Sequence, residues 1–307
     1  EPVIGVFANR THEVIPIDNC LIQNKKSEEI AKFIIEFIKE KNISIYDEKK
    51  GKGLVRHIVT KVGIKTGEIM CVIVINGHKI PNENELVENL KTRYPEIKAI
   101  VKNINMKNTN VILGQENINL YGNGYIEDIL GEYKFKISPL SFYQVNPVQA
   151  EKLYNLGVSM AEITKNDVVF DLYCGIGTIS LFMSKFAKKV YGIEIVEEAV
   201  KMAKENAQNN NVSNTEFFAG DVEIVLDDLI NNKGLKADVV MFDPPRKGLD
   251  KKSIDNILNI RPKKIVYISC NPATLIRDLA DFENEYDIKT IIPVDMFPFT
   301  SHVECVA

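Results

Sequence analysis

The chain has 307 residues, a length that predicts about two domains of roughly 150 residues each. Its apolar fraction of 45% and charged fraction of 26% are typical of an ordinary soluble globular protein with buried cores. No apolar run approaches the roughly 20 residues that span a bilayer, no leader resembles a signal peptide, and the net charge of −4 gives no overall attraction for a polyanion. We therefore expect a cytoplasmic protein without membrane contact, in which any nucleic acid binds a local basic patch.

The cysteines give no sign of a complete metal site or of disulfides. The five of them, at positions 20, 71, 174, 270 and 305, are odd in number and scattered, and no CxxC pair occurs. Reduced thiols, as in the cytoplasm, are the expectation. The sequence begins with Glu1 rather than Met, so we expect it to be part of a longer protein.

Residues 1–130 predict a smaller, mixed α+β domain. Helices are expected at 27–42, where apolar residues recur every three or four positions, and at 83–93. Ser27 is the expected N-cap of the first. The turn GIKTG predicts a hairpin between two of the strands. Strands are expected at 3–7, 13–17, 54–62, 68–77, 97–105 and 110–114.

From residue 131 onward, strands alternate with helices, which predicts a parallel sheet with right-handed crossovers over 131–307. A helix is expected at 147–161, with Pro147 in its first turn. Gln144 lies just ahead of this helix and either faces a pocket or belongs to a polar interdomain linker. The strands are expected in DVVFDL, KVYGIE, TEFFAG, ADVVMF, KKIVYIS, YDIKTIIPVDMF and HVECVA.

Two strand ends carry reactive side chains. Asp243 follows the apolar run VVMF, and Cys270 follows IVYIS. Because open α/β sheets bind ligands outside the carboxyl ends of their strands, this carboxylate and this thiol are a candidate catalytic pair. A helix-capping Asp and an inert buried Cys are the alternatives. The joint presence of DPPR and SCNPAT favours the catalytic pair.

The turn DLYCGIGTIS places Gly175 and Gly177 between a strand and a helix, where glycines let a ligand approach the backbone. A dinucleotide dehydrogenase would carry a third glycine where Ser180 stands. Acidic residues end the next two strands: Glu194 suits ribose hydroxyls, and Asp221 suits an adenine amino group. This arrangement resembles Rossmann-like S-adenosylmethionine-dependent methyltransferases. The alternative is that both carboxylates only cap helices.

Together, these motifs resemble the RNA (uracil-5-)-methyltransferases, which form 5-methyluridine in ribosomal and transfer RNA. FYQVNPVQAEKLY, DLYCGIGTISL, DPPRKG, IVYISCNPATLIRDL and DMFPFTSHVE occur in the family's order and spacing and cover residues 138–307. The resemblance implies an α/β fold, namely a Rossmann-like class I S-adenosylmethionine-dependent methyltransferase domain at 131–307 with a smaller α+β domain before it. It implies S-adenosylmethionine as cofactor, RNA as partner, and a monomer.

The resemblance also assigns roles. It implies Cys270 of SCNPAT as the nucleophile and Glu304 of HVE as the base. Phe299 stands where the family usually has Gln, His or Tyr, so we expect a different contact with RNA or with the neighbouring loop. The cofactor-binding residues that it implies are Gln144, Tyr173, Gly175, Gly177, Thr178, Glu194, Asp221 and Asp243.

Uracil chemistry explains this choice of residues. Carbon 5 becomes nucleophilic when a thiolate adds to carbon 6, and a Cys both adds and leaves well. A base then removes the carbon 5 proton, and the target base has to leave its stack to reach such a site.

Three residues are candidate substrate contacts. Asp243 can hydrogen-bond the uracil edge or the cofactor. Arg246 can offset charge on the enolate oxygen, with a phosphate contact or a structural ion pair as alternatives. Phe142 can stack on the base or be a core aromatic.

Cys20, in DNCLIQ, is open to two interpretations. It is either a small core residue, or a ligand of a metal or cluster site whose partners lie upstream. DNCLIQ resembles the segment with the last of four cysteines that hold a [4Fe–4S] cluster in many members of the family. The other three would precede Glu1, so a cluster is expected only in the full-length protein.

Because cluster-bearing members often act on ribosomal RNA, 23S ribosomal RNA is favoured over transfer RNA. Other functions remain as alternatives. A nucleic-acid amino-methyltransferase using the DPPR site would carry an aromatic residue where Arg246 stands and would need no Cys270. A non-catalytic RNA-binding module would be expected to lack Cys270 or Glu304.

Overall fold

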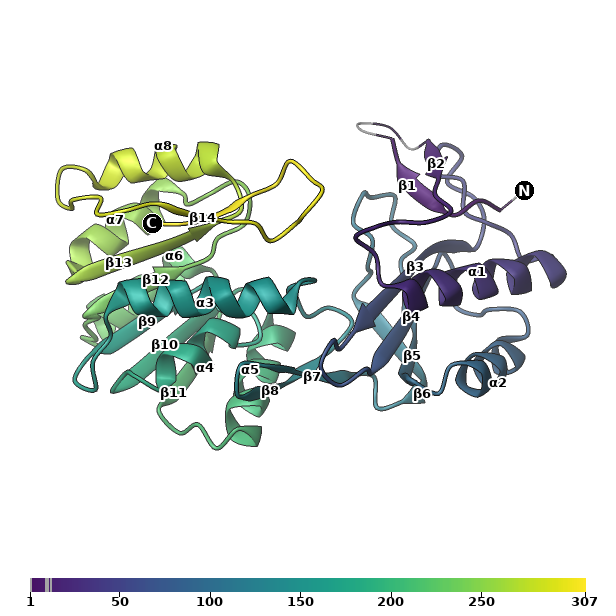
Figure 1. Ribbon diagram of the computed structural model, residues 1–307, viewed down its shortest axis with the longest axis horizontal. Coiled ribbons are helices and arrows are strands. Elements are labelled where there is room, and N and C mark those ends of the chain that lie inside the picture. Colours follow the sequence, from purple (N-terminus) through teal and green to yellow (C-terminus); the bar gives the residue numbers. More distant parts are fainter. Residues whose placement is uncertain (1, 9–10, 12) are drawn as a thin grey trace. The chain divides into compact units, whose positions relative to one another are not determined.

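The computed structural model describes residues 2–8, 11 and 13–307. The chain divides into two compact units, which we call the N-terminal unit (1–129 with 137–140) and the C-terminal unit (130–136 with 141–307). Strands β7 (Ile126–Leu130) and β8 (Tyr133–Ile137) form a separate two-stranded sheet. Each unit is built around its own sheet (Figure 1).

The N-terminal unit contains a sheet in the order β3-β4-β5-β6 and a separate antiparallel pair, β1 and β2. β4 and β5 are parallel, and the other neighbours in the sheet are antiparallel. Its elements are β1 (Gly5–Phe7), β2 (Val14–Pro16), α1 (Lys25–Glu40), β3 (Val55–Val62), β4 (Ile69–Ile75), α2 (Glu83–Arg93), β5 (Ile97–Ile104) and β6 (Glu116–Gly122).

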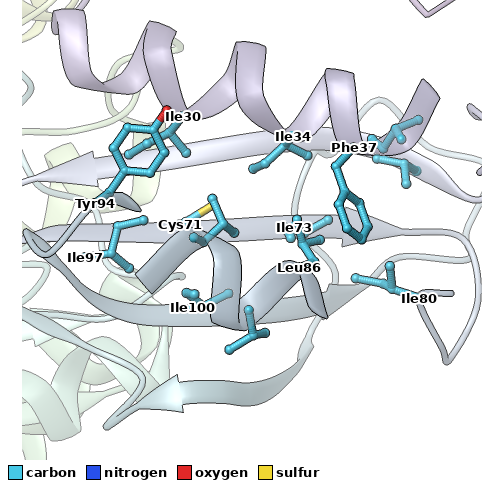
Figure 2. Packing of buried hydrophobic residues seen from close by; sticks show 14 of the residues in the cluster. Ile30, Ile34, Phe37, Cys71, Ile73, Ile80, Leu86, Tyr94, Ile97 and Ile100 are labelled. Atoms are coloured by element: carbon cyan, nitrogen blue, oxygen red, sulfur yellow. The ribbon is translucent and has the colours of Figure 1, made fainter. Parts of the chain in front are cut away.

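The core of this unit forms where α1 and α2 pack against the sheet. The apolar stripe predicted for the first helix is present: Ile30, Ile34 and Phe37 are buried and point toward β4 and β5 (Figure 2). Leu86 of α2 joins the same cluster, and every residue of β4 is buried. A fully buried strand explains why its sequence, IMCVIVI, is apolar throughout rather than alternating.

Two local predictions for this unit are wrong. The N-cap of α1 is Asn24, whose side chain accepts a hydrogen bond from the Lys26 amide, and the predicted cap Ser27 is buried inside the first turn. No strand forms at 110–114. There, the buried Asn105 side chain donates to the carbonyl groups of Val111 and Ile112, at 2.7 and 3.0 Å, and these bonds hold the segment as a loop.

The C-terminal unit is a doubly wound α/β structure with strand order β11-β10-β9-β12-β13-β15-β14. Its elements after β8 are α3 (Pro147–Ala161), β9 (Val168–Leu172), α4 (Thr178–Ser184), β10 (Lys189–Glu194), α5 (Glu197–Asn209), β11 (Thr215–Ala219), α6 (Val222–Asp227), the π-helix η1 (Asp228–Asn232), β12 (Val239–Phe242), α7 (Lys251–Ile260), β13 (Lys264–Ser269), α8 (Pro272–Phe282), β14 (Ile292–Val294) and β15 (Glu304–Val306).

Helices cover both faces of this sheet (Figure 1). α6, α7 and α8 share one apolar cluster with β9, β10, β12 and β13, while α3, α4 and α5 contact strands of the same sheet without belonging to that cluster. Strand order reverses between β9 and β12, which are neighbours although β10 and β11 lie between them in sequence. Ligands of open α/β sheets bind at the carboxyl edge of such a switch point.

The prediction of an all-parallel sheet is correct for β9 to β13 and wrong at one edge. β15 runs antiparallel to both β13 and β14. The connection from β14 to β15 contains no crossover helix, and a strand that returns through a loop alone pairs antiparallel. None of the helices that the structure describes is long and apolar enough to span a bilayer.

Candidate active site

A pocket of about 650 Å³ lies at the carboxyl ends of β9, β10, β12 and β13, within the size range of small-molecule sites. Of the catalytic, cofactor-binding and substrate residues predicted from the sequence, all but Gly177 line it, and the candidate metal ligand Cys20 lies elsewhere. The predicted residues that line it are Phe142, Gln144, Tyr173, Gly175, Thr178, Glu194, Asp221, Asp243, Arg246, Cys270 and Glu304.

The two glycines of the turn after β9 have different surroundings. Gly175 has a φ of 55°, and a Cβ there would meet no atom within 4 Å, so this position leaves open space in the pocket. Gly177 has a φ of 83° and is the N-cap of α4; a Cβ there would lie 3.1 Å from the Phe217 ring and 3.2 Å from Ala203. Gly177 therefore allows close packing behind the loop, whereas Gly175 faces open space in the pocket.

Ser180, which stands where a dinucleotide-binding turn would have its third glycine, also has a structural role. The Ser180 hydroxyl donates a hydrogen bond to Oδ2 of Asp171, a fully buried carboxyl at the end of β9. Oδ1 of Asp171 has no hydrogen-bond partner among the described residues. Burial raises the pKa of Asp171 to about 7, and the Ser180 hydroxyl opposes that rise. A glycine at 180 would remove this hydroxyl and leave the buried carboxyl only the hydrogen bond from the backbone of residue 180.

Glu194 and Asp221 bind backbone amides and line the pocket at the same time. Glu194 accepts from the Gly175 amide at 3.1 Å and from the Val196 amide at 2.9 Å, through its two different oxygens. Asp221 caps α6 by accepting from the Glu223 amide at 2.9 Å. The capping alternative is therefore correct for Asp221 and wrong for Glu194, because the N-cap of α5 is Val196 and no side chain caps that helix. Capping does not exclude ligand binding, because a carboxylate oxygen can accept more than one hydrogen bond.

Gln144 lies in the pocket wall, so the linker interpretation of this residue is wrong. Its amide and the Thr178 hydroxyl are both hydrogen-bonded to the hydroxyl of Tyr154, a buried residue of α3. Sequence reasoning missed Tyr154, although it is the last residue of the motif FYQVNPVQAEKLY. Tyr154 thus joins the segment before α3 to the start of α4.

The predicted catalytic residues come from three strands. Asp243 follows β12, Cys270 follows β13, and Glu304 opens β15. Ser269 pairs with Cys305 in the antiparallel ladder between β13 and β15, so the register places Glu304 beside Cys270. The antiparallel edge that the sequence pattern did not predict is therefore what brings the thiol and the carboxylate together.

Burial dominates the electrostatics of these groups. It raises the pKa of Glu304 to about 7, with the Arg246 guanidinium acting in the opposite direction. Burial, together with the charges of Glu304 and Asp171, raises the pKa of Asp243 well above its usual range. Burial raises the pKa of the Cys270 thiol as well; Glu304 and Asp243 add to this rise and Arg246 opposes it.

Two candidate substrate contacts lie at the open side of the pocket. Phe142 is 70% exposed, so the core-aromatic alternative is wrong for it. Arg246 is exposed, and its Nη2 lies 3.4 Å from Nδ1 of His302. Within the described part of the chain, Arg246 makes no ion pair with a carboxylate, which leaves the substrate and phosphate interpretations.

Cys20 belongs to the N-terminal unit, far along the sequence from the pocket residues. It is partly buried, and its amide donates to Oε1 of Glu28 at 2.8 Å. Across residues 2–8, 11 and 13–307, no group of three or more His, Cys, Asp or Glu side chains is arranged to hold a metal ion. The described residues therefore do not form a complete cluster site.

Comparisons with known proteins agree on one family. A family model described as tRNA (uracil-5-)-methyltransferase matches residues 7–307. An uncharacterized RNA methyltransferase of Caldanaerobacter subterraneus is 51% identical over 100% of this chain and 68% of its own length. A second one, of Clostridium acetobutylicum, is 50% identical over 100% of this chain and 66% of its own length. The chain thus spans about two thirds of these relatives.

A solved structure is similar as well. It is the tRNA (uracil-54, C5)-methyltransferase of Pyrococcus abyssi in complex with S-adenosyl-L-homocysteine, with a TM-score of 0.76 and 30% identity. The similarity covers 96% of this chain and 69% of that one. It therefore extends over both units of the present chain.

Proposed function

The chain belongs to the tRNA (uracil-5-)-methyltransferase family, and we propose that it transfers a methyl group from S-adenosylmethionine to carbon 5 of uracil in RNA. The C-terminal unit has the Rossmann-like class I fold of S-adenosylmethionine-dependent methyltransferases, as predicted. The observation that carries the proposal is the position of a thiol, Cys270, beside a carboxylate, Glu304, in a pocket with room for a cofactor.

The pocket residues fit S-adenosylmethionine. Glu194 suits the ribose hydroxyls and Asp221 the adenine amino group, while the open space at Gly175 admits the ligand against the backbone. Gln144 and Thr178, joined through Tyr154, border the same pocket. The related archaeal enzyme was solved with S-adenosyl-L-homocysteine, the demethylated form of this cofactor. The cofactor supplies a methyl group bound to a positively charged sulfur.

Cys270 is proposed to begin the reaction. Its thiolate adds to carbon 6 of the uracil, the ring electrons move toward the carbonyl oxygen at carbon 4, and carbon 5 becomes nucleophilic. Burial and neighbouring carboxylates raise the pKa of this thiol, which favours its protonated form. Only the thiolate is the nucleophile, so the thiol has to lose its proton before it reacts. Arg246 favours the thiolate and is placed to offset charge that develops on the uracil oxygen.

Glu304 is proposed to complete the reaction. After methylation, carbon 5 carries both a methyl group and a proton. Glu304 removes that proton, the electron pair re-forms the ring double bond, and the carbon–sulfur bond breaks to release Cys270. A pKa of about 7 suits this step, because such a carboxylate is substantially ionised near neutral pH and still basic enough to accept a proton.

Within RNA, we propose 23S ribosomal RNA as the substrate class, on the basis of the resemblance of the Cys20 segment to cluster-bearing members. Transfer RNA is the alternative, favoured by the substrate of the archaeal relative. Amino methylation at the DPPR site is a weaker alternative, because it gives no function to Cys270. A cytoplasmic monomer is proposed for the full-length protein, and a free Cys270 thiol suits the reducing cytoplasm.

The test uses the full-length protein, its Cys270→Ala variant, and RNA labelled with tritium at uracil carbon 5. We expect tritium release that requires both S-adenosylmethionine and Cys270, with a loss of about a thousandfold or more in the variant. Cys71→Ala is the matched control, because Cys71 is buried in β4 and does not line the pocket.

Separate reactions with unmodified 23S ribosomal RNA and transfer RNA transcripts identify the substrate class. Methyl transfer that persists in Cys270→Ala would overturn the covalent mechanism and point to amino methylation.

A further inference from the structure

The loop between β14 and β15 presents an aromatic side chain to solvent. Phe299, on this loop, is 84% exposed, an unusual position for a large apolar ring. Its φ of 66° lies in the left-handed region, which bulky non-glycine residues rarely adopt. In Figure 1 the loop is yellow and extends beyond the strands that it joins.

Hydrogen bonds within the loop stabilise this backbone. The Phe297 carbonyl accepts from the Thr300 amide at 3.2 Å and from the Thr300 hydroxyl at 2.7 Å. The same hydroxyl accepts from the His302 amide at 3.2 Å. Strained positions that persist because their surroundings determine them are concentrated at binding sites and active sites. The loop thus holds Phe299 exposed.

The loop lies at the rim of the pocket. Phe297 and Glu304, on either side of Phe299 in the chain, both line the pocket. The Met296 carbonyl accepts from the Asn146 side chain at 3.1 Å, which ties the loop to the segment that carries Phe142 and Gln144. Phe299 is therefore an exposed residue of a loop that lines the pocket on both sides of it in the chain, and it does not line the pocket itself.

We propose that Phe299 enters the RNA at the position that the target uracil vacates and stacks on the adjacent base. This inference rests on the proposed function, since it presupposes an RNA uracil that leaves its stack. Apolar side chains that insert between bases compensate for lost stacking, and aromatic rings stack on any base. Lys247, exposed at the same pocket, is placed to attract a flanking phosphate.

The roles of the two exposed aromatic residues then differ. Phe142 lines the pocket and suits the flipped uracil, whereas Phe299 lies outside it and suits the base left behind. Stacking of this kind tolerates any neighbouring base, so Phe299 strengthens binding without reading sequence.

The test compares the full-length protein with Phe299→Ala, Phe299→Tyr and a matched control, Phe186→Ala. Phe186 is an exposed phenylalanine that follows α4 and does not line the pocket. With the ribosomal or transfer RNA transcript that the wild-type protein methylates, Phe299→Ala should raise the KM for RNA by about 5- to 100-fold. Its KM for S-adenosylmethionine should not change. Phe299→Tyr and Phe186→Ala should behave like the wild type.

A spectroscopic readout separates stacking from a general structural role. 2-Aminopurine replaces the base next to the target uracil, and its fluorescence is measured in the protein–RNA complex. We expect a quenched signal with the wild type and with Phe299→Tyr, and a brighter signal with Phe299→Ala. Equal KM values and equal fluorescence for wild type and Phe299→Ala would overturn the inference. A wild-type protein that methylates no RNA uracil would instead overturn the proposed function.

Discussion

The two units use buried side chains in different ways. In the N-terminal unit, α1, α2 and β4 close around an apolar cluster, and Cys71 lies inside it. In the C-terminal unit, Asp243, Cys270 and Glu304 gather where strands end at a pocket. Burial raises the pKa of Cys71 to about 12 and that of Glu304 to about 7. Burial thus keeps the Cys71 thiol in the closed core protonated and unreactive, and it makes the Glu304 carboxylate in the pocket more basic.

The largest expected effect is on turnover, from removing the base in the pocket. Glu304→Gln should lower turnover by about 10²- to 10⁴-fold, because the amide cannot accept the carbon 5 proton. The covalent protein–RNA adduct should then accumulate, since elimination of Cys270 requires that proton to leave. Tritium release measures turnover, and a denaturing gel shift measures the adduct.

Glu223→Gln is the control for that experiment, because Glu223 is another carboxylate that lines the pocket but lies at α6. It should release tritium at nearly the wild-type rate. Normal turnover in Glu304→Gln would assign the proton abstraction to a different group.

The next largest effect is on the closed core. Ile34→Ala should lower the free energy of unfolding of the N-terminal unit by about 2–5 kcal/mol, because Ile34 is fully buried and its loss leaves a cavity. Hydrogen exchange of the β4 amides reports this change. Ile64→Ala, at a half-exposed position in the turn between β3 and β4, should cost far less. Equal effects from the two substitutions would contradict the packing of α1 on the sheet.

A smaller effect concerns thiol reactivity in the two units. Iodoacetamide should alkylate Cys270 much faster than Cys71, because Cys71 is inaccessible and its pKa is raised to about 12. Burial, Glu304 and Asp243 raise the pKa of the Cys270 thiol. The increase of its reactivity with pH should therefore occur at higher pH than for a free cysteine.

Glu304→Gln removes a negative charge that is present above pH 7, so this variant should move the reactivity curve of Cys270 to lower pH. Mass spectrometry of the alkylated peptides measures the rates of Cys270 and Cys71 and the pH curves of wild type and variant. A range of about pH 6–10 is suitable, because it includes the pKa of an ordinary cysteine thiol. A curve unchanged by Glu304→Gln would show that the two groups do not interact.

Regular elements with strong periodicity were predictable from the sequence. The helices expected at 83–93 and 147–161 have those bounds in the structure, because apolar spacing and Pro147 both determine them locally. The strand expected at 110–114 does not form, because the buried side chains of Asn103 on β5 and of Asn105 just after it bind that segment's backbone instead. An interaction between separate segments overrode the local β preference there.

The sequence by itself determined the family, the candidate reactive side chains and the strand ends that carry Asp243 and Cys270. Motif order and local periodicity are enough for these, because each depends on neighbouring residues. Only the tertiary structure decided that Glu304 lies beside Cys270, that Tyr154 joins Gln144 to Thr178, and that Phe299 is exposed at the pocket rim. These features depend on pairing between β13 and β15 and on burial, which involve residues far apart in the chain and leave no local pattern.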